Sequence, residues 1–152
     1  MRLKGLNCIV TGGSSGIGAA TVKRFVDEGA QVLIADIEID TANSFAEEMG
    51  SSVGAIKCDV RIEADVKAVS DHAYKTWGKV DVLVNNAGSE LNQTYDKTTL
   101  EEWDRVLDTD LKGPWLMCKY IVPGMVDAGS GSVINISSLN GLVGFPLSTA
   151  YG

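Results

Sequence analysis

The glycine-rich stretch TGGSSGIG, Thr11–Gly18, is the segment whose residue types and spacing most directly suggest chemistry. It separates an apolar run from an amphipathic stretch, so it is expected to connect a strand to a helix. Glycines allow a tight turn in which backbone N–H groups approach a phosphate, and the helix N-terminus adds partial positive charge. The stretch therefore predicts a phosphate-binding loop, and the plainer alternative is a flexible turn with no ligand.

An acid stands where such a loop requires one. Asp36 ends the next apolar run, QVLIAD, at a place where a carboxylate can accept hydrogen bonds from the ribose hydroxyls of adenosine. A 2′-phosphate would be repelled by Asp36, and neither the loop nor the positions just after Asp36 carry an Arg or Lys to hold one. The sequence thus favours a dinucleotide site, with NAD preferred and NADP less favoured.

Short apolar runs alternate with amphipathic stretches along the whole chain. This alternation predicts right-handed strand–helix–strand crossovers and a parallel sheet, an α/β fold of the Rossmann type: doubly wound, with helices on both faces in three layers. Asp40 is a candidate N-cap, Gly50 a helix stop and Gly113-Pro114 a helix kink or break. The predicted strands are 6–10, 31–36, 52–60, 80–85 and 131–138, and the predicted helices are 17–28, 40–50, 63–77 and one or two within 100–127.

Length and charge limit the function further. A chain of 152 residues with no linker is expected to form one domain, 1–152. A net charge of −7 argues against partners such as nucleic acid or an anionic membrane. No apolar run is long enough to span a bilayer and no signal peptide is recognisable, so a cytoplasmic location is expected.

The metal-binding residue types are sparse. Cys8, Cys58 and Cys118 are widely spaced and lie in apolar segments, so free and mostly buried thiols are expected. The only histidine, His72, falls in a charged helical stretch and is expected at the surface. No metal site is predicted.

With NNAG at 85–88, the sequence closely resembles the short-chain dehydrogenase/reductase family, whose pattern is T-G-x-x-x-G-x-G, then an acid, N-N-A-G, a serine and Y-x-x-x-K. The match extends from Leu6 to Tyr151. It implies that Asp59 binds the adenine amino group and that the NNAG segment runs beneath the cofactor ribose. The implied cofactor-binding residues are Gly12, Ser14, Gly16, Ile17, Gly18, Asp36, Asp59, Val60, Asn86, Ala87 and Gly88.

The resemblance also implies a reaction and its residues. Tyr151 would be the general acid/base and Ser138 would hydrogen-bond the substrate oxygen, while a hydride passes between nicotinamide and an alcohol carbon. The lysine that normally lowers the pKa of the tyrosine would fall beyond Gly152. The resemblance therefore implies an N-terminal portion of a longer NAD-dependent oxidoreductase, with the C-terminal strands missing. The alternative is a dinucleotide-binding half-domain with little turnover.

Asp110, in DLKG, stands where the family commonly has an asparagine of the catalytic group. An ionised aspartate accepts hydrogen bonds but cannot donate them, and its charge would tend to raise the pKa of the tyrosine.

The resemblance implies a small alcohol or ketone as substrate. It places segments 89–97 and 139–145 at the mouth of the site, with Glu90 and Asn140 as candidate polar contacts or plain surface residues. The helices within 103–126 resemble those that form homodimers and homotetramers in the family.

Overall fold

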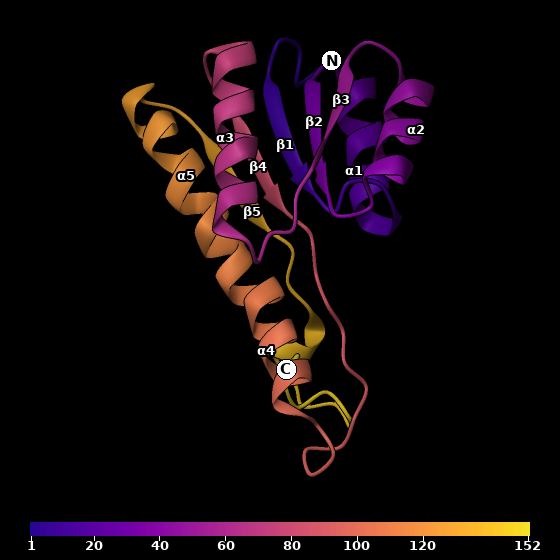
Figure 1. Cartoon of the computed structure of the whole chain (residues 1–152). Coiled ribbons are helices and arrows are strands. Elements are labelled where there is room, and N and C mark those ends of the chain that lie inside the picture. The colour runs from indigo at the N-terminus through magenta and orange to yellow at the C-terminus, as the bar shows by residue number, and fades with distance from the viewer.

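A parallel sheet of five strands forms the centre of the molecule, which is described over residues 1–152 by a computed structural model (Figure 1). The strands are β1 (Asn7–Thr11), β2 (Gln31–Asp36), β3 (Val53–Lys57), β4 (Val82–Asn85) and β5 (Ser132–Asn135). Their order across the sheet is β3-β2-β1-β4-β5, and Val10 of β1 lies opposite both Ile34 and Val84. The strand order therefore reverses between β1 and β4, and ligands of open α/β sheets bind at such a reversal.

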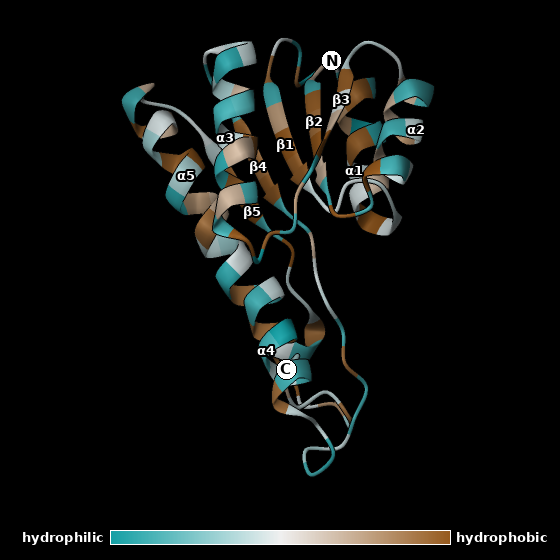
Figure 2. Ribbon diagram, in the orientation of Figure 1, coloured by the Kyte–Doolittle hydropathy of each residue, from teal (hydrophilic) through white to brown (hydrophobic).

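Helices cover both faces of this sheet. On one face α1 (Gly16–Asp27) and α2 (Ile39–Met49) cover a core that includes Cys8 and Val10 of β1. On the other, α3 (Glu63–Trp77) and α5 (Gly113–Asp127) pack on Ile9. Successive side chains of a strand point to opposite faces, and a strand covered on both faces must be apolar throughout. Figure 2 shows this apolar character along most of β1 and β2. The predicted doubly wound, three-layer α/β fold is confirmed.

The predicted elements are all present, but their bounds differ in places: β5 ends at Asn135 where the strand was predicted to reach 138, and β4 begins at Val82 rather than at 80. Two further differences lie in the first half of the chain. The predicted strand 52–60 ends at Lys57, because the residues after it leave the sheet to border a cavity described below. Asp40 is not an N-cap: α2 begins at Ile39 with Glu38 in the N-cap position, and Asp40 lies in the first turn. There its negative charge is stabilised by the partial positive charge of the helix N-terminus.

The stretch predicted to kink or break at Gly113-Pro114 is not broken there. Helix α4 (Leu100–Leu107) continues through a π-helical turn, Asp108–Lys112, directly into α5. Pro114 is the second residue of α5, directly after the π-helical turn, and the chain keeps its helical path through it. Gly113 is needed for close packing, because a Cβ there would approach Val60 Cγ2 to 2.8 Å.

Several residues noted in the sequence are placed by the fold. His72 is exposed, Cys8 and Cys58 are buried, and Cys118 is half-buried. Burial raises the pKa of the Cys8 and Cys58 thiols to about 12, so neither is a nucleophile at neutral pH. None of the helices combines the length and the apolar composition that crossing a membrane demands. Strand β5 is exposed at the edge of the sheet.

Candidate functional site

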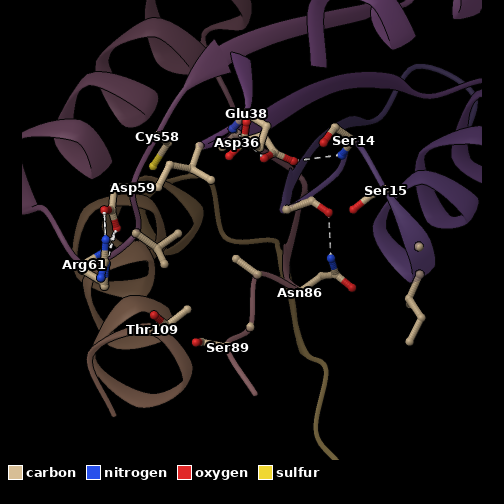
Figure 3. Close-up of a pocket in the computed structure, with 18 of the residues that line it drawn as sticks. Ser14, Ser15, Asp36, Glu38, Cys58, Asp59, Arg61, Asn86, Ser89 and Thr109 are labelled. Carbon is tan, nitrogen blue, oxygen red and sulfur yellow. Dashed lines mark hydrogen bonds and ion pairs between the residues drawn. The ribbon is translucent and has the colours of Figure 1, made fainter. Parts of the chain in front are cut away.

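Two adjoining cavities open where the strands end at their carboxyl side. The first, about 560 Å³, lies between the loop after β1 and the segments after β2 and β3 (Figure 3). The second, about 480 Å³, lies between the segment after β4, the π-helical turn and the segment after β5. The cavities adjoin, and four residues line both of them: Ile17, Asn86, Ala87 and Gly88.

The glycines of the loop after β1 meet two separate demands. Gly12 and Gly16 have φ of +60° and +51°, left-handed conformations that only glycine adopts without strain. Gly18 is needed for space, because a Cβ there would overlap the Gly12 carbonyl oxygen and approach Asn86 Nδ2 to 2.6 Å. Helix α1 therefore starts directly against the loop and the segment after β4.

The N-terminus of α1 offers an anion site to the first cavity. Ser15 is its N-cap residue but makes no side-chain capping hydrogen bond, and the first turn contains no acid. The backbone N–H groups at this end thus have no capping side chain, and Ser14, Ser15 and Gly16 line the cavity. Exposed N–H groups and the helix dipole make such an end favourable for a phosphate. The loop residues therefore fit the pyrophosphate of a dinucleotide.

Asp36 borders the first cavity and is held rigidly. Its Oδ2 accepts a hydrogen bond from Ser14 N at 3.0 Å and its Oδ1 accepts one from Glu38 N at 3.1 Å (Figure 3). The side chain is 6% exposed. A carboxylate has about four acceptor positions, so Asp36 keeps capacity for the two hydroxyls of a ribose.

Asp59 and Val60 border the other side of the same cavity, together with a residue that the sequence analysis did not single out, Arg61 (Figure 3). Arg61 forms an ion pair with Asp59, with Nη2 2.6 Å from Oδ2. Hydrogen bonds from the guanidinium hold the pKa of Asp59 below its usual value. The signal available in the sequence was an arginine two positions after the acid, but only the fold shows that both face the cavity.

The NNAG segment is bound to the loop after β1. Asn86 Nδ2 donates to the carbonyl oxygens of Thr11 and Gly12, both at 3.0 Å. Thr11 Oγ1 in turn accepts from the backbone N–H groups of Asn86 and Ala87, again at 3.0 Å. These four bonds fix the floor shared by the two cavities.

The three residues predicted to be catalytic, Ser138, Tyr151 and Asp110, all line the second cavity. They come from three separate parts of the chain: the segment after β5, the C-terminal turn and the π-helical turn. Ser138 Oγ accepts a hydrogen bond from Asn140 N at 3.2 Å. A hydroxyl oxygen that accepts one bond can still donate its proton to a ligand oxygen.

Only one of the two carboxylate oxygens of Asp110 has a hydrogen-bond partner. Its Oδ1 accepts from Ser89 N at 2.7 Å, whereas its Oδ2 is buried and has no hydrogen-bond partner. Burial raises the pKa of Asp110 above its usual value, although the Ser89 N–H and the positive charge of Arg105 partly oppose this. The asparagine common in the family would place a neutral group here, so the aspartate brings a charge into a poorly solvated position.

The two candidate substrate contacts, Glu90 and Asn140, are not among the residues that line either cavity. Glu90 is exposed and its Oε1 accepts from Asn92 Nδ2 at 3.3 Å. Asn140 uses its backbone N–H to bind Ser138, and its role toward a substrate stays a prediction. The first mouth segment contacts the chain just after the second, where Gln93 N donates to Leu147 O at 2.8 Å.

Comparison with known proteins gives consistent matches. The sequence profile of the family described as short chain dehydrogenase matches residues 7–152. Momilactone A synthase of Oryza sativa subsp. japonica is 40% identical over 99% of this chain and 56% of its own length. D-threitol dehydrogenase of Mycolicibacterium smegmatis is 34% identical over 99% of this chain and 59% of its own length. The chain thus spans less than two thirds of these relatives.

A solved structure agrees with the fold. The crystal structure of a metagenomic short-chain oxidoreductase in complex with NADP superposes with a TM-score of 0.94 at 31% sequence identity. The match covers 99% of this chain and 70% of that one.

Proposed function

Because the chain belongs to the short-chain dehydrogenase family, we propose that it binds NAD and serves the transfer of a hydride between nicotinamide and a secondary alcohol or ketone. The observation that carries the proposal is that the two cavities adjoin, with Ile17, Asn86, Ala87 and Gly88 lining both. One ligand can then place its adenosine near Asp36 and Asp59 and its nicotinamide near Ser138 and Tyr151. Residues 1–152 act in this proposal as one dinucleotide-binding domain.

The chain's own groups have distinct roles in this proposal. The loop after β1 and the N-terminus of α1 hold the pyrophosphate, and Asp36 accepts the ribose hydroxyls. Ser138 Oγ donates a hydrogen bond to the substrate oxygen, and Tyr151 Oη exchanges a proton with that oxygen. A bound nicotinamide supplies the hydride acceptor or donor.

We propose NAD rather than NADP because of the negative charges around the position proposed for the ribose. Asp36 is fixed there by two backbone N–H groups, and Glu38 borders the same cavity. Arg61, the nearest candidate partner of a 2′-phosphate on the opposite wall, is already paired with Asp59. The similar structure with NADP shows that a relative accepts the phosphorylated cofactor, so this preference needs a direct test.

The test is calorimetric titration of the chain with NAD and with NADP. We expect NAD to bind about tenfold more tightly, because Asp36 would repel the 2′-phosphate, and we expect Asp36→Asn to remove this preference. Asp71→Asn, at an exposed ion pair on α3, is the matched control and should change neither affinity. Tighter binding of NADP by the wild-type chain would contradict the preference, and binding of neither cofactor would contradict the function.

Turnover is tested separately from binding. Reduction of NAD in the presence of secondary alcohols is followed by absorbance, with Tyr151→Phe as the variant. The variant should lose about 10²–10⁴-fold in rate and keep its NAD affinity, since only the proton-transfer group is removed. NAD binding without turnover in the wild-type chain would instead support the second candidate, a binding half-domain.

We also propose self-association through α4 and α5. Trp103 and Trp115 expose 38% and 58% of their surface on these helices, and Val126 exposes 70%. Partly exposed tryptophans are enriched where proteins meet one another. Analytical ultracentrifugation would show a dimer or tetramer if this is correct and a monomer if it is not.

A further inference from the structure

Arg61 has no role in the proposed reaction, yet it makes the densest set of hydrogen bonds at the first cavity. Its Nε donates to both carboxylate oxygens of Asp59, at 2.9 and 3.1 Å, and its Nη2 donates to Oδ2 at 2.6 Å. Its backbone N–H donates to Oδ1 at 3.0 Å. The Asp59 side chain is 12% exposed and that of Arg61 36% exposed.

These contacts leave Asp59 almost no freedom. The carboxylate is held on one side by a planar guanidinium fork and by a backbone N–H of the same residue. The backbone N–H of Asp59 itself donates to Asp65 Oδ2 at 3.0 Å, in the first turn of α3. The side chain and the backbone of Asp59 are therefore both anchored, and rotation of the carboxylate would break several bonds at once.

The same contacts determine how much acceptor capacity remains. An ionised carboxylate has about four acceptor positions. Oδ1 takes the Arg61 backbone N–H and Nε, whereas Oδ2 takes Nη2 and shares Nε. Capacity for one further donor thus remains on Oδ2, and Asp59 and Val60 line the cavity. An exocyclic amino group of a base can supply that donor, whereas a keto oxygen at the same place cannot.

We propose that Arg61 is a positioning residue that makes the first cavity selective for an amino-bearing base, by fixing Asp59 so that one acceptor position stays available to the base. The inference rests on the proposed binding of a dinucleotide. In this inference Arg61 enables the site to distinguish adenine from hypoxanthine. Adenine carries an amino group where hypoxanthine carries a keto oxygen.

A purely electrostatic role for Arg61 gives a different expectation. Three carboxylates line the first cavity, those of Asp36, Glu38 and Asp59, against the two cations Arg61 and Arg105. Removing one cation would weaken the binding of any pyrophosphate, whatever its base, and a lysine would restore it. Lysine carries the charge but cannot form the planar two-point contact of a guanidinium, so Arg61→Lys separates the two roles.

The experiment is calorimetric titration with NAD and with nicotinamide hypoxanthine dinucleotide. The proteins are the wild type, Arg61→Ala, Arg61→Lys and the control Arg24→Ala, which removes another arginine paired with a carboxylate at a distant surface. The wild type and the control should prefer NAD by roughly tenfold, the worth of one hydrogen bond to a charged group. In both Arg61 variants this preference should fall to within about twofold.

Each other outcome overturns the inference. Equal losses for both dinucleotides in Arg61→Ala, with recovery in Arg61→Lys, would show that only the charge matters. A wild-type chain that binds both dinucleotides equally would show that Asp59 does not read the amino group. A wild-type chain that binds neither dinucleotide would overturn the proposed function and, with it, this inference. Failure of the inference alone is recognised because the wild type then still binds NAD.

Discussion

The two cavities differ in how far their polar groups are satisfied within the protein. In the first, Asp36 is held by two backbone N–H groups and Asp59 by Arg61. In the second, Asn85 Oδ1 and Asp110 Oδ2 are buried without a hydrogen-bond partner. Strand β5, whose end borders the second cavity, is exposed along its length.

This difference indicates a division of labour. Fixed groups are suited to recognition, because a ligand then binds without ordering the side chains it meets. Buried groups with unused hydrogen-bonding capacity are rare elsewhere and concentrate where ligands or reacting atoms are handled. The first cavity therefore has the properties of a recognition site, and the second those of a site completed by what enters it.

The largest effect is expected from Gly18→Ala, which should destroy the preorganised cavity. The added Cβ would overlap the Gly12 carbonyl oxygen, so the loop or α1 must move. We expect a loss of about 3 kcal/mol in stability by chemical denaturation and a loss of NAD binding by titration. Gly54→Ala on β3, where a Cβ meets only Leu33 Cδ1 at 3.7 Å, should be close to neutral. Retained NAD affinity in Gly18→Ala would show that the close approach is dispensable.

Thr11→Val should damage the floor shared by both cavities. The substitution keeps the shape but removes the acceptor of the Asn86 and Ala87 backbone N–H groups at a residue that is 1% exposed. Unsatisfied buried donors cost about 2 kcal/mol in the free energy of unfolding, and dinucleotide affinity should fall as well. Thr21→Val, which loses only a bond to its own helix, is the control. Equal stability of the two variants would contradict the shared-floor role.

Asp110→Asn should stabilise the protein, the reverse of the first two changes. The substitution keeps the acceptor for Ser89 N and removes a charge from a position where Oδ2 has no partner. A gain of about 1 kcal/mol in the free energy of unfolding at neutral pH is expected. Asp108→Asn, at a surface pair with Lys112 in the same π-helical turn, should have little effect.

The gain in the free energy of unfolding expected from Asp110→Asn should depend on pH in a defined direction. Burial raises the pKa of Asp110 in the folded state, so folding favours its protonated form. Below the ordinary aspartate pKa of about 4 the wild type carries no charge penalty, and the penalty grows as pH rises through the raised folded value. The stability difference between Asp110→Asn and the wild type should therefore vanish in acid and reach its full size at neutral pH. A difference that is independent of pH would contradict this account.

Much of the fold followed from local patterns. Continuous apolar runs predicted β1 and β2, and the helix over Glu63–Trp77 was predicted with its observed bounds. The α4–α5 region was less predictable, because a π-helical turn leaves no clear periodic signal and Pro114 is compatible with a helix start. Asp40 was misplaced by two positions for a similar reason, since several acidic or polar residues near a helix start compete for the cap.

The sequence by itself determined the glycine loop, the acid after β2 and the NNAG segment, because each lies next to a strand end and its role depends on neighbours in the chain. Only the tertiary structure decided that Ser138, Tyr151 and Asp110 share one cavity and that it adjoins the other, with four residues lining both. It also decided that Arg61 lines the first cavity and that Asp110 Oδ2 has no hydrogen-bond partner. The physical reason is that burial and hydrogen-bond satisfaction depend on which distant segments pack together, and parallel crossovers bring strand ends far apart in sequence to one edge of the sheet.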